Sequence, residues 1–382
     1  MKKLMIIGAG MFQVPLIKEC KKQGHFVIAT DLNPNAEGFN YSDIALNIDT
    51  LDKELTLEKA LEYKIDGILT TSDSPVKTVA YVCEKLNLCG LTVSSAEITT
   101  NKLLLRQHLE SRNIESTRYY NINNINTLLN DLIYPLIVKP VDSSASRGVK
   151  KVNNKEQLLS AYEEALSYSK KQSIIIEEYI EGREFSVESL TQNGITHIVS
   201  ITEKTTIGSP YFVESRHVIP ADLTDIENNQ IKSKVCLVID ILGINNSACH
   251  TEVKLTDKGV RIIEIGARLG GDYITSDLVP LSNGINMLEN IIRIALGLQV
   301  NIEKKSDNYS GIQFITSDNY DFILKNIDKI SKDTNIVNFS INNTLNTNSR
   351  LCNSLDRLGY YICVAQNRVD LNNMLDRYII RK

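Results

Sequence analysis

The sequence HTEVKLTDKGVRIIEIGAR, residues 250–268, decides the fold of the region around it. Two runs of alternating, β-branched residues flank Asp257-Lys258-Gly259. This pattern is typical of a β-hairpin whose three-residue loop has glycine in the left-handed position. We expect Thr256 to pair with Val260 across the loop, and this register fixes every other pair along the two strands.

In that register Glu252 faces Glu264. Opposed residues on one face of an antiparallel pair lie about 5 Å apart at Cβ, so two like charges there repel unless a cation sits between them. Such a pair suits Mg²⁺, which takes few protein carboxylates and fills its shell with phosphate oxygens and water. Mn²⁺ would accept the same oxygen ligands. The alternatives are a solvated hairpin face, or a register slip of one residue that puts the two side chains on opposite faces.

The composition is that of an ordinary globular protein. The chain has 382 residues, of which 42% are hydrophobic and 23% charged, and this length predicts two or three domains. The net charge is −4 and the basic residues are dispersed, so a nucleic-acid surface is not indicated. No stretch is apolar enough to span a membrane, and the first apolar run ends at Gly8, too soon for a signal peptide. We expect a cytoplasmic protein without nucleic-acid or membrane partners, and a homodimer stays open.

The seven cysteines are scattered and form no C-x-x-C pair. An odd, dispersed set is typical of reduced core thiols in a cytoplasmic protein. Cys249 lies beside His250, which raises the idea of a nucleophile with its base. Neighbouring residues on a strand point to opposite faces, so the sequence argues against that role.

The first 95 residues predict a small doubly wound α/β domain with a parallel sheet. The expected strands cover residues 4–7, 25–30 and 67–70, and the expected helices cover 14–23, 54–63 and 75–86. The turn after the first strand, Gly8-Ala9-Gly10-Met11-Phe12-Gln13, resembles a dinucleotide fingerprint with Gln13 in place of the third glycine. Asp31 falls at the spacing of a ribose-binding acid. The turn either binds a nucleotide or needs glycine only for its backbone.

The rest of the chain predicts an α+β block and a smaller α+β unit that begins near residue 305. In the block we expect helices at 97–111, 154–170 and 285–297, strands at 133–140 and 173–176, and short strands over 195–202. The smaller unit ends in a strand at 360–365 and a helix at 369–378.

Several residues of the block have chemistry that suits a nucleotide. Lys139 ends an apolar strand, where we expect it at the rim of a cleft, and a lysine there can hold a phosphate as a point charge. The small polar loop Ser143–Gly148 follows, and its N–H groups and hydroxyls could cover phosphate oxygens. After the next strand, the backbone of Glu177–Ile180 could match a purine edge, and Glu184 could accept hydrogen bonds from ribose. Alone, each feature also fits an ordinary surface strand end or loop.

The order of these features resembles the ATP-grasp superfamily over most of the chain. The N-terminal domain looks like the pre-ATP-grasp domain, and the segment Arg357–Ile362 looks like the C-terminal unit of the carboxylase, carbamoyl-phosphate synthase and L-amino-acid ligase branches. The resemblance implies a doubly wound α/β domain at 1–95, a two-lobed ATP-grasp domain at 96–304 with a mobile lobe at about 115–182, and a C-terminal α+β domain at 305–382.

The resemblance also implies roles for single residues. Lys102 and Lys139 match two phosphate-binding lysines, Glu252 and Glu264 match the metal ligands, and Arg268 matches an arginine that faces the acyl-phosphate or its acceptor. Lys139 and Arg268 are therefore the candidate catalytic residues. The full set of expected ATP contacts is Lys102, Lys139, Ser143, Ser144, Ser146, Gly148, Glu177, Glu178, Ile180 and Glu184.

Three positions depart from the family pattern. Asn101 replaces a common Asp, and Ala145 replaces a common loop Gly, which should stiffen the loop. Gly266 stands where many members carry a metal-binding Asn, so one or two Mg²⁺ ions fit the sequence.

The expected function is an ATP-dependent ligase. ATP would phosphorylate a carboxylate, and an amine or similar nucleophile would displace phosphate from the acyl-phosphate, with catalysis by positioning and charge neutralisation. Candidate substrate contacts are Gly270, Asp272, Arg216 and His217, and Arg216 could bind a carboxylate bidentately. Purine-pathway carboxylation, peptide-bond formation and natural-product ligation all fit.

Two other functions compete with the ligase. A nicotinamide-dependent oxidoreductase could use the first glycine turn, but it would leave the paired glutamates without a role. A catalytically weak ATP-binding module is the other, and Ala145 and Gly266 favour it.

Overall fold

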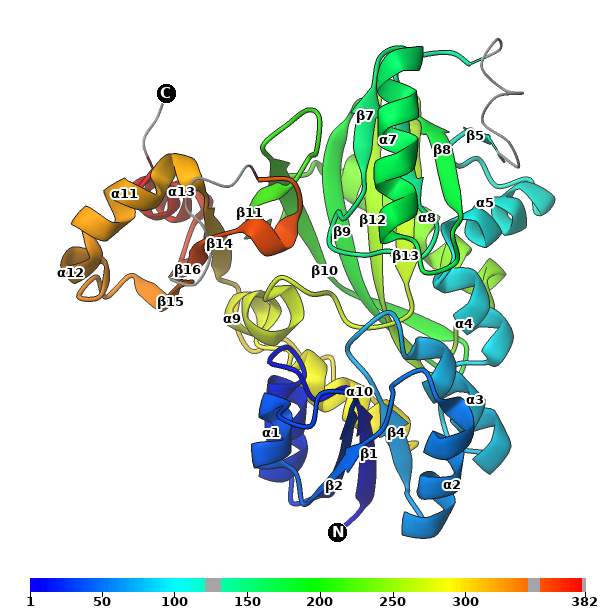
Figure 1. The fold of residues 1–382 in the computed structure, drawn as a ribbon. Helices are drawn as coiled ribbons and strands as arrows, with labels where there is room; N and C mark the ends of the chain where they lie inside the picture. The colour runs from blue at the N-terminus through cyan, green and yellow to red at the C-terminus, as the bar shows by residue number, and fades with distance from the viewer. Residues whose placement is uncertain (121–131, 343–350, 380–382) are drawn as a thin grey trace.

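The structure is a computed structural model that describes residues 1–120, 132–342 and 351–379. Figure 1 shows a blue N-terminal domain below, a large sheet with a small green lobe above it, and an orange and red C-terminal unit to one side. The mixed α/β and α+β class predicted from the sequence is confirmed. Part of the expected mobile lobe, residues 121–131, lies outside the described residues.

The N-terminal domain contains a parallel sheet in the order β3-β2-β1-β4. Its strands are β1 (Lys3–Ile7), β2 (Phe26–Asp31), β3 (Ile44–Asn47) and β4 (Gly67–Leu69), and its helices are α1 (Val14–Lys22), α2 (Lys53–Tyr63) and α3 (Val76–Leu86). β1 is apolar from Leu4 to Ile7 because both of its faces are buried there. Leu4 and Ile6 pack in a cluster with residues of α1, while Met5 and Ile7 pack in a cluster with residues of α3. The doubly wound prediction is confirmed.

The helix predicted over residues 97–111 is wrong as a single element. The structure has α4 (Val93–Thr99) and α5 (Lys102–Ser111), with a break between them. Asn101 causes the break, because its side chain accepts hydrogen bonds from the N–H groups of Leu103 and Leu104 and caps α5.

The small lobe is a four-stranded antiparallel sheet with one helix against it. The strand order is β5-β8-β6-β7. The elements are β5 (Tyr119–Tyr120), β6 (Leu136–Pro140), β7 (Lys150–Val152), β8 (Ile174–Glu178) and α7 (Lys155–Tyr168). Leu136, Val138, Ile176 and Leu158 form part of the core between the helix and the sheet.

A second antiparallel sheet of eight strands runs through the rest of the molecule in the order β13-β12-β9-β10-β11-β14-β16-β15. Its strands are β9 (Arg183–Gln192), β10 (Ile195–Thr206), β11 (Glu214–Ile219), β12 (Ser247–Thr256), β13 (Gly259–Gly266), β14 (Tyr309–Ile315), β15 (Ile336–Ile341) and β16 (Gly359–Ala365). The short strands expected over 195–202 are wrong, because β10 is one strand of 12 residues. β11 pairs with β14, so the sheet continues across the boundary expected at residue 305.

Helices surround the large sheet. They are α8 (Asp225–Ile241), α9 (Val279–Asn283), α10 (Met287–Ala295), α11 (Ser317–Lys325), α12 (Ile327–Ile330) and α13 (Arg368–Asp376), with short helical turns at Glu37–Tyr41, Ile274–Leu278 and Ser354–Asp356. α10 contacts both α1 and β4, so it joins the N-terminal domain to the large sheet. Within the described residues, no helix has the length and apolar character needed to cross a bilayer.

The hairpin of β12 and β13 closes differently from the prediction. Only Asp257 and Lys258 lie in the turn, and Thr256 pairs with Gly259 rather than with Val260. Gly259 has φ +100°, a conformation that suits glycine. The three-residue loop is therefore wrong.

A bulge restores the register that matters. Val253 pairs with Ile262 while Glu252 pairs with Glu264, so the register shifts by one residue beside the glutamates. The shorter turn shifts the register by one residue, and the bulge shifts it back by one. The predicted opposition of Glu252 and Glu264 is confirmed, although the path to it differs.

Candidate active site

Arg106, Glu177 and Lys139 form a buried network, which we call the cationic triad. Arg106 Nε donates to Glu177 Oε1 at 2.8 Å, and Lys139 Nζ lies 2.6 Å from Oε2 of the same carboxylate. Arg106 Nη2 also donates to the carbonyl of Ile263 at 2.6 Å, which ties α5 to the hairpin. Two cations share one carboxylate, so the triad has a surplus of positive charge.

Burial decides how the triad behaves. The side chains of Lys139 and Glu177 are only 5% and 4% exposed, so the cleft-rim position expected for Lys139 is wrong. Burial lowers the pKa of Lys139. Burial alone would raise the pKa of Glu177, but Arg106 and Lys139 hold it below its usual range. The Glu177 carboxylate is thus engaged by cations.

The segment expected to read adenine is partly occupied by the protein's own backbone. The N–H of Glu178 donates to the carbonyl of Arg118, and the N–H of Tyr179 donates to that of Pro135. The Glu178 carboxylate accepts from the Arg118 N–H at 2.9 Å. The carbonyl of Ile180 accepts from Lys254 Nζ at 3.1 Å. Adenine recognition by this segment stays a prediction.

Lys102 bridges the small lobe and the hairpin. Its ammonium donates to the carbonyl of Ser143 at 2.7 Å and lies 3.0 Å from Glu264 Oε1. In the loop, Ala145 and Ser146 have φ of +59° and +57°, which costs energy for residues with a side chain. The departure at Ala145 therefore places a Cβ in a left-handed position that glycine would adopt without strain.

The rest of the predicted phosphate loop is held by local bonds. The Ser144 carbonyl accepts from Arg147 Nε at 3.0 Å, and the Ser146 carbonyl accepts from the Val149 N–H. Ser143 Oγ is buried without a partner among the described residues. The Ser354 N–H, from the C-terminal unit, donates to the carbonyl of Ala145 at 3.2 Å. The loop thus contacts α5 through Lys102 and the C-terminal unit through Ser354, two segments far away in the sequence.

A second charged group, which we call the acidic cluster, surrounds Lys204. It consists of Lys204 on β10, Glu184 on β9, Glu214 on β11 and Glu252 on β12. The ammonium of Lys204 lies 2.7 Å from Glu252, 3.2 Å from Glu214 and 3.3 Å from Glu184. One cation therefore faces three carboxylates, and the cluster has a surplus of negative charge.

The protonation of the acidic cluster follows from this arrangement. Burial alone would lower the pKa of Lys204 and raise that of Glu252. The three carboxylates instead hold the pKa of Lys204 well above its usual range, and Lys204 holds that of Glu252 well below. Lys204 and Glu252 are thus both charged at neutral pH.

The donor set fits a divalent cation that keeps open positions. Glu252 and Glu264 share one face of the hairpin, and each touches a lysine, Lys204 or Lys102. Among the described residues no group of three His, Cys, Asp or Glu side chains suits a metal. Oxygens from a bound molecule would therefore complete the shell, as Mg²⁺ prefers.

His250 and Glu188 form a buried pair beside the acidic cluster. His250 Nδ1 lies 2.6 Å from Glu188 Oε1, and His250 Nε2 lies 3.5 Å from Glu252 Oε1. Burial alone would lower the pKa of His250, but Glu188 raises it to about 9. Burial raises the pKa of the Cys249 thiol, so a thiolate nucleophile is not supported, as the sequence argued.

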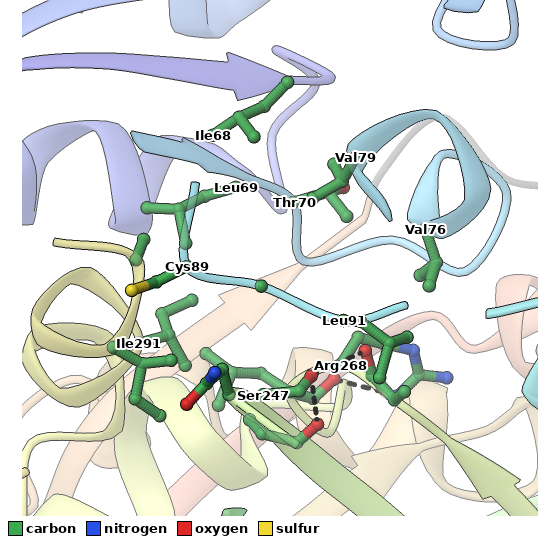
Figure 2. A pocket seen from close by; sticks show the side chains of 17 residues that line it. Ile68, Leu69, Thr70, Val76, Val79, Cys89, Leu91, Ser247, Arg268 and Ile291 are labelled. Atoms are coloured by element: carbon green, nitrogen blue, oxygen red, sulfur yellow. Dashed lines mark hydrogen bonds between the residues drawn. The ribbon is translucent and has the colours of Figure 1, made fainter. Parts of the chain in front are cut away.

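Arg268 reaches across a domain boundary. Its guanidinium is bound by Asp73, from the loop after β4, through Nε at 2.7 Å and Nη2 at 2.8 Å. Arg268 lines an apolar cavity of about 60 Å³ between the N-terminal domain and the large sheet. Figure 2 shows its side chain with those of Leu91, Val76 and Ile291 around this cavity. Burial alone would raise the pKa of Asp73, but Arg268 holds it below its usual range.

The candidate substrate residues separate into two groups. Asp272 accepts from Arg357 Nη1 and Nη2 at 2.9 and 2.5 Å, and His217 Nε2 lies 3.5 Å from it. Arg216 lies on the other face of β11, because strand neighbours alternate. It donates to Gln313 at 2.7 Å and to Asp376 at 2.5 Å. Protein side chains thus engage Arg216, and its contact with a substrate stays a prediction.

Gly270 approaches the buried His–Glu pair closely. A Cβ at this position would lie 2.7 Å from both Glu188 Oε2 and His250 Nδ1. Only glycine fits there, so Gly270 is required by packing, and its contact with a substrate stays a prediction.

The N-terminal glycine turn does not present a free ribose-binding acid. The Asp31 carboxylate accepts from the N–H groups of Ala9 at 2.8 Å and Asn33 at 2.9 Å. Gln13 is buried, and its amide donates to the hydroxyls of Thr71 and Ser72 at 3.2 and 2.7 Å. These contacts favour the backbone interpretation of the glycines over nucleotide binding.

Sequence reasoning assigned no role to several residues that shape the site. Lys204, Asp73, Glu188 and Arg357 each meet partners far away in the chain. In sequence, Lys204 resembles any strand lysine. The one available signal was Thr71-Ser72-Asp73-Ser74, a polar run at the carboxyl end of a parallel strand, where ligands often bind.

Comparisons with known proteins show what this chain is similar to. Residues 132–277 match the model of the ATP-grasp domain. A formate-dependent phosphoribosylglycinamide formyltransferase from Prochlorococcus marinus is 26% identical over 327 residues, which cover 78% of this chain and 77% of that protein. An alanine–anticapsin ligase from Bacillus subtilis is 26% identical over 236 residues, 55% of this chain. The match covers 49% of that ligase, so the chain spans about half its length.

The fold is also found among solved structures. The L-amino acid ligase from Bacillus licheniformis superposes with a TM-score of 0.81, and the match covers 100% of this chain and 99% of that one. The two sequences are 21% identical, so this likeness concerns the fold.

Proposed function

Because the chain belongs to the ATP-grasp superfamily of ATP-dependent ligases, we propose that it joins a small carboxylic acid to an amine through an acyl-phosphate. The observation that carries the proposal is the opposition of Glu252 and Glu264 beside two lysines. Such a pair can share Mg²⁺ with phosphate oxygens. Alanine and formate, in the names of two relatives, are both small carboxylic acids.

The two charge clusters suit the two parts of a metal–nucleotide complex. The cationic triad and Lys102 supply positive charge next to the loop Ser143–Gly148, where the triphosphate would lie. Glu252 and Glu264 would hold Mg²⁺, which neutralises the charge of the transferred phosphoryl group when it is bound. In the acidic cluster, Glu184 would accept hydrogen bonds from the ribose. The positive charge of Lys204 would offset the negative charges of Glu184 and Glu252.

The acceptor side would be formed by residues after β13. Arg268 would face the acyl-phosphate, where a guanidinium can bind two oxygens at once. His217 and Asp272 come from different elements and lie 3.5 Å apart, and Arg357 brings the C-terminal unit to Asp272. We propose that these groups orient the amine, so that they contribute to catalysis by positioning the acceptor.

A screen for phosphate release tests the proposal. Purified protein with ATP and Mg²⁺ is assayed with single amino acids, pairs of amino acids, formate and other small acids, and bicarbonate. We expect release that requires an added carboxylate and a ligated product visible by mass spectrometry. ADP formation that is the same without any carboxylate would support a weak ATP-binding module, and a spectral change with NAD(P)H alone would support the oxidoreductase.

A further inference from the structure

The guanidinium of Arg268 is fixed along one edge and open along another. An arginine side chain has five N–H groups. Asp73 takes the Nε–H and one Nη2–H, and the carbonyl of Leu269 takes one Nη1–H at 2.8 Å. In the described part of the chain, nothing accepts the other two. One of them is on Nη1 and the other on Nη2, so each terminal nitrogen can still donate to an oxygen of a carboxylate or a phosphoryl group, and we call these two donors the open fork.

Asp73 is therefore well placed to aim that fork. A bidentate contact fixes the plane of the guanidinium as well as its position. The Asp73 and Arg268 side chains are 30% and 15% exposed, and apolar residues line the neighbouring cavity (Figure 2). Weak competition from water strengthens an ion pair in such surroundings.

Gly266 leaves the space in which the ion pair lies. A Cβ at this position would lie 3.3 Å from Asp73 Oδ1 and 3.5 Å from Arg268 Cζ. Its backbone φ lies outside the left-handed region, so the backbone does not need glycine here. Glycine is needed here for space, because any longer side chain would push Asp73 away from the guanidinium.

Gln13 braces the loop that carries Asp73. Its buried amide donates to Thr71 Oγ1 and Ser72 Oγ, in the two residues before Asp73. Side chains at Gly8 and Gly10 would lie 3.4 and 3.3 Å from Gln13. The residue that breaks the dinucleotide fingerprint thus has a structural use, and the glycine turn makes room for it.

We propose that Asp73 is a positioning residue for Arg268, and that the N-terminal domain acts in the reaction by aiming this arginine. The role of Arg268 in the reaction rests on the proposed ligase function, whereas its contact with Asp73 does not. Asp73 aligns the open fork with the acyl-phosphate oxygens, and Gly266 and Gln13 keep Asp73 in place. The N-terminal domain then completes the active site without touching the nucleotide.

The geometry is tested without turnover. In ¹⁵N-labelled protein, hydrogen exchange of the Arg268 Nε–H is followed by NMR in the wild type, Asp73→Ala and the shape-conserving Asp73→Asn. We expect exchange to be about tenfold or more faster in Asp73→Ala, since a fixed hydrogen bond slows it. The control is Asp43→Asn, which weakens the ion pair of Asp43 with Lys21 at 2.6 Å elsewhere in the same domain. Equal exchange in the wild type and both Asp73 variants would overturn the clamp.

The positioning role is tested on the carboxylate–amine pair found by the phosphate-release screen. Asp73→Ala should lower kcat by about 10- to 100-fold, as small misplacements of catalytic groups do, while the calorimetric affinity for ADP with Mg²⁺ stays unchanged. Gly266→Val should give the same pattern with Asp73 intact, and Asp43→Asn should match the wild type. A raised KM for the amine with unchanged kcat would overturn the proposal, because Asp73 would then bind substrate directly.

Failure of the ligase function gives a different result. A wild-type protein with slow Arg268 Nε–H exchange and no turnover on any acid–amine pair would refute the ligase and leave the clamp standing. Full kcat in Asp73→Ala would refute the positioning role and leave the ligase standing.

Discussion

The cationic triad and the acidic cluster are both built from basic residues and glutamates, but their net charges have opposite signs. In the triad two cations share one carboxylate, and in the acidic cluster three carboxylates share one cation. The triad is closed and nearly fully buried, whereas Glu252 is 23% exposed. The first therefore depends on the fold to hold its charges together, away from solvent. The second has unbalanced charge at an accessible edge, which is what a site for a cation requires.

Removing the carboxylate of the triad should have the largest effect. Glu177→Gln would leave Arg106 and Lys139 buried without a counter-charge, and breaking a buried pair in this way costs about 3–5 kcal/mol. Chemical denaturation should show this loss of unfolding free energy. A loss below about 1 kcal/mol, the range of an exposed pair, would mean that the triad is not closed.

Removing the charge of Glu264, the metal-ligand candidate opposite Glu252, should lower activity rather than stability. Glu264→Gln should lower phosphate release by about 10²–10³-fold or more, since a group that balances transition-state charge is lost. Unfolding free energy should change by less than about 1 kcal/mol, because Glu264 is 32% exposed and its one ion pair among the described residues is with Lys102. Glu289→Gln is the matched control, with 31% exposure and an arginine partner. Activity near the wild-type level would show that the glutamate pair is only a solvated hairpin face.

Lys139 should affect both properties, because it belongs to the triad and lies next to the phosphate loop. Lys139→Met keeps the apolar stem and should weaken ATP binding by about 1.5–3 kcal/mol, the size of a lost charge-assisted hydrogen bond. Calorimetry measures the binding, and thermal unfolding should show a loss of stability as well. Unchanged ATP affinity with lower stability would assign Lys139 to the fold alone.

The smallest effect concerns acid. The pKa of Glu177 is held below its usual range, so its stabilising effect is present above the unfolded pKa of about 4.3 and is lost as pH falls through the lower folded value. The stability difference between wild type and Glu177→Gln should therefore be constant at neutral pH and shrink below about pH 4. Denaturation at several pH values measures it, and a difference that grows in acid would reverse the assigned sign.

Patterns of short range were the ones that sequence could predict. Strand alternation and the hairpin turn led to Glu252 opposite Glu264, and the glycine turn led to the N-terminal βαβ unit. The bulge beside Val253 left no trace in the residue types, and the opposition was predicted only because the shorter turn cancelled it. Burial of Lys139 was missed because its partner Glu177 is on β8 and the second cation of the triad, Arg106, is on α5, both far away in the chain.

Contacts between residues far apart in the chain could not be predicted from the sequence for the same reason. Asp73 and Arg268 are 195 residues apart, and Lys204 and Glu252 are 48 apart. A lysine with three carboxylates around it and a lysine in solvent look alike in a sequence. Only the fold decides between them, because the sheet order brings β9, β11 and β12 around β10.

The pairing of β11 with β14 has a consequence for anyone who divides this protein. A chain cut at residue 304 would remove β14 from one side of β11 (Glu214–Ile219) and leave β10 on the other. The strand would then present unpaired N–H and C=O groups along an edge where Val218 and Ile219 are buried in the intact protein. Such an edge recruits other chains. The last 78 residues thus protect the catalytic half from its own copies, and a minimal soluble fragment has to retain them.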